Sequence, residues 1–140
     1  MKSLESLIRI HRFQLDELRA ELVRLEAERG ALLTQADEID IEMEVESARI
    51  HLGLAEAQGF SVWIGARLAH QAGLRRRAQD LDAEIEAQRD RVAEGFRELK
   101  TIELLWEEHL ARAATERARR ETAALDEAAL TAHIRATRAG

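Results

Sequence analysis

The stretch Gln58-Gly59-Phe60-Ser61 interrupts a helical pattern of apolar residues that extends on both sides of it. Apolar residues recur at helical spacing from Leu4 to Ile50, and the same spacing resumes after the stretch and continues past Leu110. Glycine suits the position just past a helix end, and serine caps the next helix by accepting from its unpaired amides. The sequence therefore predicts one domain, residues 1–140, with a first helix over about 4–57, a turn at about 58–61 and a second helix over about 62–136.

The composition is that of a long-helix protein. The chain has 140 residues, no proline, 4% aromatic and 34% charged residues, which is typical of a coiled coil rather than of a compact globule. It contains no cysteine, which excludes disulfides and thiolate metal sites. Charges at Lys2 and Glu5 argue against a signal peptide, and no apolar stretch reaches the roughly 20 residues that span a bilayer. We expect a soluble, cytoplasmic protein.

The charge is unevenly distributed. Residues 1–59 contain 7 basic and 13 acidic residues, whereas residues 60–140 contain 14 of each. Nucleic-acid binding needs clustered Lys and Arg for phosphate contacts, so an acidic first half argues against it.

Both predicted helices follow a heptad frame. In the first helix eleven of the fourteen core positions are apolar, and such sustained spacing indicates a coiled-coil seam. The first helix has a positions Ile8, Leu15, Leu22, Arg29, Ala36, Met43 and Ile50 and d positions Leu4, His11, Leu18, Leu25, Leu32, Ile39 and Glu46. The second has a positions Ala78, Ile85, Val92, Leu99, Trp106 and Ala113 and d positions Leu74, Leu81, Gln88, Gly95, Ile102 and His109.

An antiparallel pairing of these frames makes the numbers of facing residues add to a constant. The value 117 places the midpoint between Gln58 and Gly59 and sets Arg29 opposite Gln88. It also sets the acidic stretch 37–44 opposite Arg75-Arg76-Arg77. The predicted fold is therefore all-α, a long antiparallel two-helix coiled-coil hairpin with a C-terminal helical overhang beyond about Ala114.

Two segments are candidate partner-binding surfaces. Apolar residues crowd just after the predicted turn, where a two-helix rod offers little core, and such clusters mark binding sites. The overhang is an amphipathic helix without a partner. The candidate residues are Phe60, Val62, Trp63, Ile64 and Leu68 after the turn, and Leu125, Asp126, Glu127, Leu130 and Ile134 in the overhang.

No catalytic, metal or cofactor site is predicted. The histidines are not spaced as helix-borne metal ligands, and phosphate-binding glycine loops and nucleophile elbows are absent from the sequence. We expect His11 and His109 to be half-buried seam residues and Trp106 to be a large seam residue. The carboxylates from Asp37 to Glu46 are expected to form a solvated helix face, with binding of cations or of a basic partner as the alternative.

Four motifs in the same order resemble the flagellar export proteins of the FliJ family, in its alphaproteobacterial form. The resemblance covers nearly the whole chain. The motifs lie at residues 2–12 with Asp16-Glu17, at residues 59–64, at residues 96–103 and at residues 119–127.

The resemblance implies an antiparallel coiled coil similar to the stalk of rotary ATPases. It implies a non-enzymatic component of the flagellar type III export apparatus, without a cofactor, which binds the hexameric export ATPase, promotes its activity and contacts the export gate. Some members also escort empty substrate-specific chaperones. Such a protein is cytoplasmic and peripheral to the inner membrane through its partners.

Three alternatives remain open. The equivalent stalk protein of a virulence injectisome shares the architecture, and a parallel dimeric coiled coil would serve as a structural linker. A helical metal enzyme would need clustered ligands, which the sequence does not show.

Overall fold

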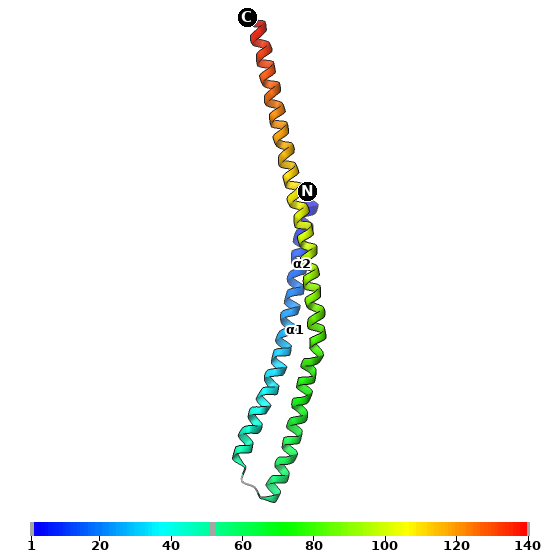
Figure 1. Cartoon of the computed structure of the whole chain (residues 1–140), viewed down its shortest axis with the longest axis vertical. Helices are drawn as coiled ribbons and strands as arrows, with labels where there is room; N and C mark the ends of the chain where they lie inside the picture. The colour runs from blue at the N-terminus through cyan, green and yellow to red at the C-terminus, as the bar shows by residue number, and fades with distance from the viewer. Residues whose placement is uncertain (1, 51–52, 140) are drawn as a thin grey trace. The chain divides into compact units, whose positions relative to one another are not determined.

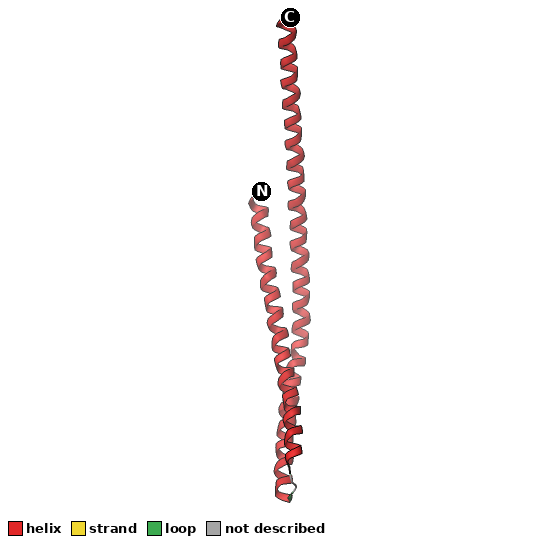
Figure 2. Ribbon diagram, turned by 90° about the vertical axis from the view of Figure 1, so that its left-hand side faces the viewer, coloured by secondary structure: helices red, strands yellow, loops and turns green. Residues whose placement is uncertain are grey.

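Two long helices make up the structure. The computed structural model describes residues 2–50 and 53–139. Helix α1 is Lys2–Arg49 and helix α2 is Leu54–Ala139 (Figure 1). Within the described ranges only Ile50 and Gly53 lie outside the helices, and no strand occurs (Figure 2). The predicted all-α coiled-coil hairpin is confirmed.

The turn does not lie where the sequence predicted it. Residues 58–61 belong to α2, and α1 ends at Arg49 rather than near residue 57. The Ala57 amide donates to the Gly53 carbonyl at 2.9 Å, so Gly53 occupies the N-cap position of α2. Gly59 does not adopt the left-handed conformation that the predicted turn required. It instead tolerates a helix interior, at a cost of about 1 kcal/mol relative to Ala.

The chain falls into two compact units, one of which is Phe13–Phe96. This hairpin unit contains the loop side of α1 and α2. Its hydrophobic core includes a cluster of small and branched side chains from both helices, with Ala36 fully buried. The cluster comprises Leu32, Ala36, Ile39, Leu74 and Ala78, with Leu33, Met43 and Leu81 packed against it.

The predicted heptad frame is confirmed by burial. Each of the fourteen core positions assigned to the first helix and the twelve assigned to the second is buried or half-buried. The frame also continues back from Leu74 through Gln71, Arg67, Ile64 and Phe60, all of which are buried or half-buried. The seam therefore extends from its predicted end at Leu74 back to Phe60, 14 residues closer to the loop.

The predicted register is wrong by one heptad. In the hairpin unit, Arg29 pairs with Asp82 at 2.6 Å, and Gln88 donates to the Leu18 carbonyl at 2.9 Å, so Arg29 and Gln88 do not face each other. The residue numbers in the interhelical polar contacts of this unit add to between 106 and 115, centred near 110 rather than 117. The two helices are therefore antiparallel and displaced by seven residues from the predicted register.

The displacement has a physical cause. A shift of seven residues keeps every a position opposite a d position, so both registers bury the same face of each helix. The observed register brings Phe60 and Ile64 into the seam, whereas the predicted one left them in or beside a turn. It keeps one expected charge match, because Arg75 contacts Asp40 at 3.2 Å.

The second unit comprises Met1–Arg12 and Arg97–Gly140. Within it, Ile8 and Leu99 are buried, His11 lies 3.9 Å from Glu98, and Arg12 lies 3.7 Å from Glu103. Ala113 is the last half-buried residue of α2, and residues 114–139 are helical and exposed throughout. The predicted C-terminal overhang is therefore confirmed, and we call residues 114–139 the tail helix.

Candidate partner-binding surfaces

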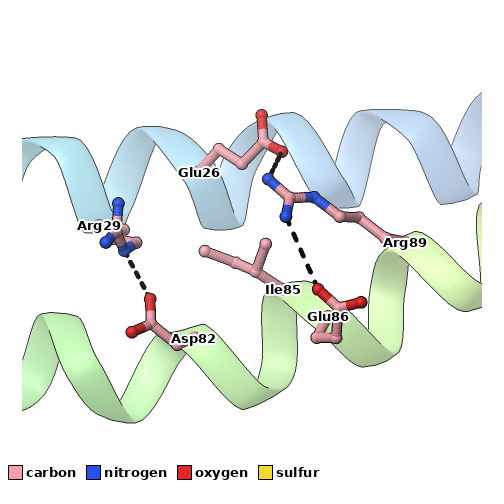
Figure 3. Close-up of a pocket in the computed structure, with 6 residues that line it drawn as sticks. All are labelled: Glu26, Arg29, Asp82, Ile85, Glu86 and Arg89. Atoms are coloured by element: carbon pink, nitrogen blue, oxygen red, sulfur yellow. Dashed lines mark hydrogen bonds and ion pairs between the residues drawn. The ribbon is translucent and has the colours of Figure 1, made fainter.

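The interhelical polar contacts near the middle of the hairpin unit are structural. Figure 3 shows Arg29 directed at Asp82 and Arg89 between two carboxylates, with the Ile85 side chain between the two pairs. Arg89 lies 3.4 Å from Glu26 on α1 and 3.7 Å from Glu86 on α2. These side chains are about half exposed, so each pair contributes at most about 1 kcal/mol and serves mainly to select the pairing. Each charged side chain that lines this hollow has an ion-pair partner.

Two buried glutamines fix α2 against α1 in the same unit. The Gln71 amide donates to the Ala36 carbonyl at 2.9 Å and to Asp40 Oδ1 at 2.6 Å. Gln88 donates to the Leu18 carbonyl and accepts from Arg91 Nη1 at 2.9 Å. Both are nearly inaccessible, at 4% and 3% exposure, and both are satisfied. They are seam residues and not ligands of a site.

The structure divides the apolar residues predicted after the turn among several environments. Phe60 and Ile64 are half-buried on the seam, and the Phe60 ring stacks on Trp63 with 5.9 Å between centroids. Leu68 and Val62 are exposed at 48% and 76%. The predicted cluster is therefore partly core, and its exposed members Val62 and Leu68 lie about 120° apart around α2.

Trp63 takes part in a groove that the sequence analysis missed. The groove runs between the helices and is lined by Ile41, Glu42, Val45, Glu46 and Trp63. Ile41 and Val45 are large apolar side chains on the outer face of α1, exposed at 60% and 42%. Their four-residue spacing outside the heptad core, within an acidic stretch, is the sequence signal that identifies them. We call these five residues the Trp63 groove.

The tail helix presents two faces rather than one. Leu130 and Ile134 are four residues apart and share a face, exposed at 59% and 42%. Leu125, five residues before Leu130, points about 140° away around the helix and is 71% exposed. Asp126 and Glu127 are exposed. The tail residues singled out from sequence are thus all accessible, but only Leu130 and Ile134 form a common apolar face.

The titratable groups of the described residues form local contacts rather than a metal-binding cluster. Across residues 2–50 and 53–139 no group of three or more His, Asp and Glu side chains is placed to hold a metal ion. His11 and His109 are half-buried, as predicted, and His109 stacks on Trp106 with 5.6 Å between ring centroids. Glu21 has a lowered pKa because Arg24 donates to it, at 2.6 and 2.9 Å, and the same contact raises the pKa of Arg24. This exposed pair lies within one turn of α1 and stabilises that helix locally.

Comparisons with known proteins add no assignment. No family model, curated protein or solved structure matches the chain. Neither helix, over the residues described, has an apolar segment long enough to cross a membrane.

Proposed function

We propose that the chain is a non-enzymatic, stalk-like component of the bacterial flagellar type III export apparatus. In this proposal it binds the hexameric export ATPase, promotes its activity and contacts the cytoplasmic domain of the export gate, with substrate-specific chaperones as further partners. It acts in the cytoplasm, at the inner face of the inner membrane, and is held there through its partners.

One observation supports the proposal above the others. Helix α2 continues for 26 residues past Ala113, and its apolar side chains there are exposed. No other segment of the described chain packs on them. An isolated helix in water is only marginally stable, so a long helix without contacts favours a partner that binds it. The ordered FliJ-like motifs, the last of which lies at residues 119–127, suggest the export ATPase as that partner.

The tail helix offers a sharp test of this assignment. We expect purified chain to bind the export ATPase and to stimulate ATP hydrolysis, and removal of residues 114–140 to abolish both effects. Within the tail, Leu130→Ser with Ile134→Ser should weaken ATPase binding by tenfold or more, because burying each side chain is worth about 1.5–3 kcal/mol. Phe13→Ser with Val23→Ser is the matched control, since both side chains are exposed and lie on α1, outside the tail helix.

The gate contact is tested separately. Trp63→Ser should reduce binding to the cytoplasmic domain of the gate while leaving ATPase stimulation unchanged. Binding to neither partner by the full chain, together with normal motility of a deletion strain, would exclude the proposed function. Stimulation that survives loss of residues 114–140 would exclude the tail helix as the ATPase-binding element.

A further inference from the structure

The outer face of α1 beside the groove carries the apolar pair Ile41 and Val45, with three carboxylates next to it. Asp37 and Val45 each lie four residues from Ile41, and Glu38 and Glu44 each lie three residues from it. On a helix these spacings make side chains neighbours. Ile41 and Val45 are therefore flanked by Asp37, Glu38 and Glu44.

These carboxylates differ from the rest of the acidic stretch. Asp40 and Glu42 contact α2, at Arg75 and Arg67, and Glu46 pairs with Arg49 on its own helix. Asp37, Glu38 and Glu44 have no hydrogen-bond or ion-pair partner among the residues that the structure describes. Residues 37–48 contain six acidic residues and no basic one, so no intrahelical cation is at hand for these three.

We propose that the Trp63 groove and the carboxylates of Asp37, Glu38 and Glu44 form a docking site for a basic amphipathic helix of another protein. An apolar side chain of that helix fits between Ile41, Val45 and Trp63, and Lys or Arg residues on its flanks pair with Asp37, Glu38 and Glu44. This is the helix-in-groove mode of recognition, in which apolar anchors supply affinity and complementary charge supplies orientation and partner choice. The site shares Trp63 with the gate contact proposed above, but its test uses a synthetic peptide and so does not depend on the export function.

A second copy of the chain is a poorer occupant. The exposed tail helix has five basic and four acidic residues, so it is nearly neutral and brings Asp126 and Glu127 towards the carboxylates. The whole chain carries a net charge of -6, which opposes association of two copies. A basic amphipathic helix from a different protein can fill the Trp63 groove with an apolar side chain and pair its Lys or Arg residues with Asp37, Glu38 and Glu44.

The test uses the intrinsic fluorescence of Trp63. Trp106 is replaced by Phe so that Trp63 is the single tryptophan, and the full-length chain is titrated with a 14-residue amphipathic helix of Leu and Lys. A peptide with Glu in place of every Lys and a peptide of tail residues 114–139 are titrated in parallel. We expect the Lys peptide to shift Trp63 emission to shorter wavelength, with affinity that falls as salt rises.

Matched variants assign the two parts of the site. Ile41→Ser with Val45→Ser should weaken the Lys peptide at least tenfold, as truncation of central anchors does. Phe13→Ser with Val23→Ser, at exposed residues elsewhere on α1, should not. The triple change Asp37→Asn, Glu38→Gln and Glu44→Gln should weaken binding and flatten its salt dependence, whereas Asp80→Asn, Glu84→Gln and Asp90→Asn, with the same change in charge, should have a much smaller effect.

Three results would overturn the proposal. The first is an unchanged Trp63 emission at saturating Lys peptide, and the second is equal weakening by the target and control triple changes. The third is tighter binding of the tail peptide than of the Lys peptide, which would make a second copy the occupant. Circular dichroism of each variant checks that the helices are retained.

Discussion

Gln71 offers a quantitative test of how the hairpin is held together. It is 4% exposed on the seam and makes two hydrogen bonds to α1, through the Ala36 carbonyl and Asp40. At about 0.5–1.5 kcal/mol each, these bonds are worth about 1–3 kcal/mol in total. Replacing Gln71 by Leu removes them but buries a side chain worth about 1.5–3 kcal/mol.

The two terms nearly cancel for Gln71→Leu. No acceptor is left stranded, because Ala36 lies inside α1 and keeps its helical bond, and Asp40 is half exposed and keeps Arg75. We expect the free energy of unfolding to stay within about 1.5 kcal/mol of the original. Gln71→Ala loses the same bonds without the apolar gain and leaves a space, so it should destabilise by about 2–4 kcal/mol.

Urea denaturation followed by circular dichroism at 222 nm measures both changes on the full chain. Equal and large destabilisation by Leu and Ala would refute the reasoning, because it would show that the polar contacts outweigh apolar burial at this seam position. No effect of Gln71→Ala would show that residue 71 is not between the helices.

Three further outcomes follow from the same contacts. Removing residues 114–140 should lower the helical signal by about a fifth, the share of helical residues lost, without moving the urea midpoint of the rest. A lower midpoint would mean that the tail helix packs on α1 or on the preceding part of α2. At Gly30 and Gly73 an added Cβ meets open space, so Gly30→Ala and Gly73→Ala should each raise the free energy of unfolding by up to about 1 kcal/mol. At Gly95 even a Cβ approaches Leu18 Cδ1 to 3.1 Å, so Gly95→Leu should lower the free energy of unfolding by about 1–3 kcal/mol. A stabilising Gly95→Leu would contradict the packing. Arg24 lowers the pKa of Glu21 below its ordinary 4.5, so the stabilisation from this pair is present above that pH and is lost as pH falls through the folded pKa. Arg24→Gln should therefore raise the Glu21 pKa measured by NMR. An unchanged pKa would show that Arg24 does not lower it.

The fold was predictable because two properties of the sequence are independent of register. The absence of proline and the 4-3 spacing from Leu4 onward define the helices and their buried faces, and burial confirms each assigned position. The exposed tail helix followed from the unequal lengths of the two arms. These features depend only on local helix geometry and on which residues are apolar.

The turn and the register were not predictable from the same pattern. A glycine at either 53 or 59 can end a helix, and shifting the helices by one heptad keeps every a position opposite a d position. The register is identified by side-chain contacts such as that of Arg29 with Asp82, and by the burial of Phe60 and Ile64 on the seam. A seven-residue ambiguity of this kind is inherent in heptad sequences.

The candidate surfaces were predicted only in part. Leu130 and Ile134 were found because an unpartnered amphipathic helix is visible in sequence, but Ile41 and Val45 were not, because their exposure depends on the register. Trp63 was singled out for its place near a turn, and its structural setting is instead a groove against α1. The carboxylates from Asp37 to Glu46 were expected to form a solvated helix face, and only Asp37, Glu38 and Glu44 have no partner among the described residues.

The register is the central claim, because the Trp63 groove exists only if α1 and α2 pair about the segment that joins Arg49 to Leu54. Introduced cysteines measure it directly, since the chain has none of its own. Ala36→Cys with Leu74→Cys should form an intramolecular disulfide under mild oxidation, because both positions belong to one core cluster. Ala36→Cys with Leu81→Cys should not, because the second cysteine is then about 10 Å further along α2, beyond the reach of a disulfide. Preferential crosslinking of residues 36 and 81 would contradict the account.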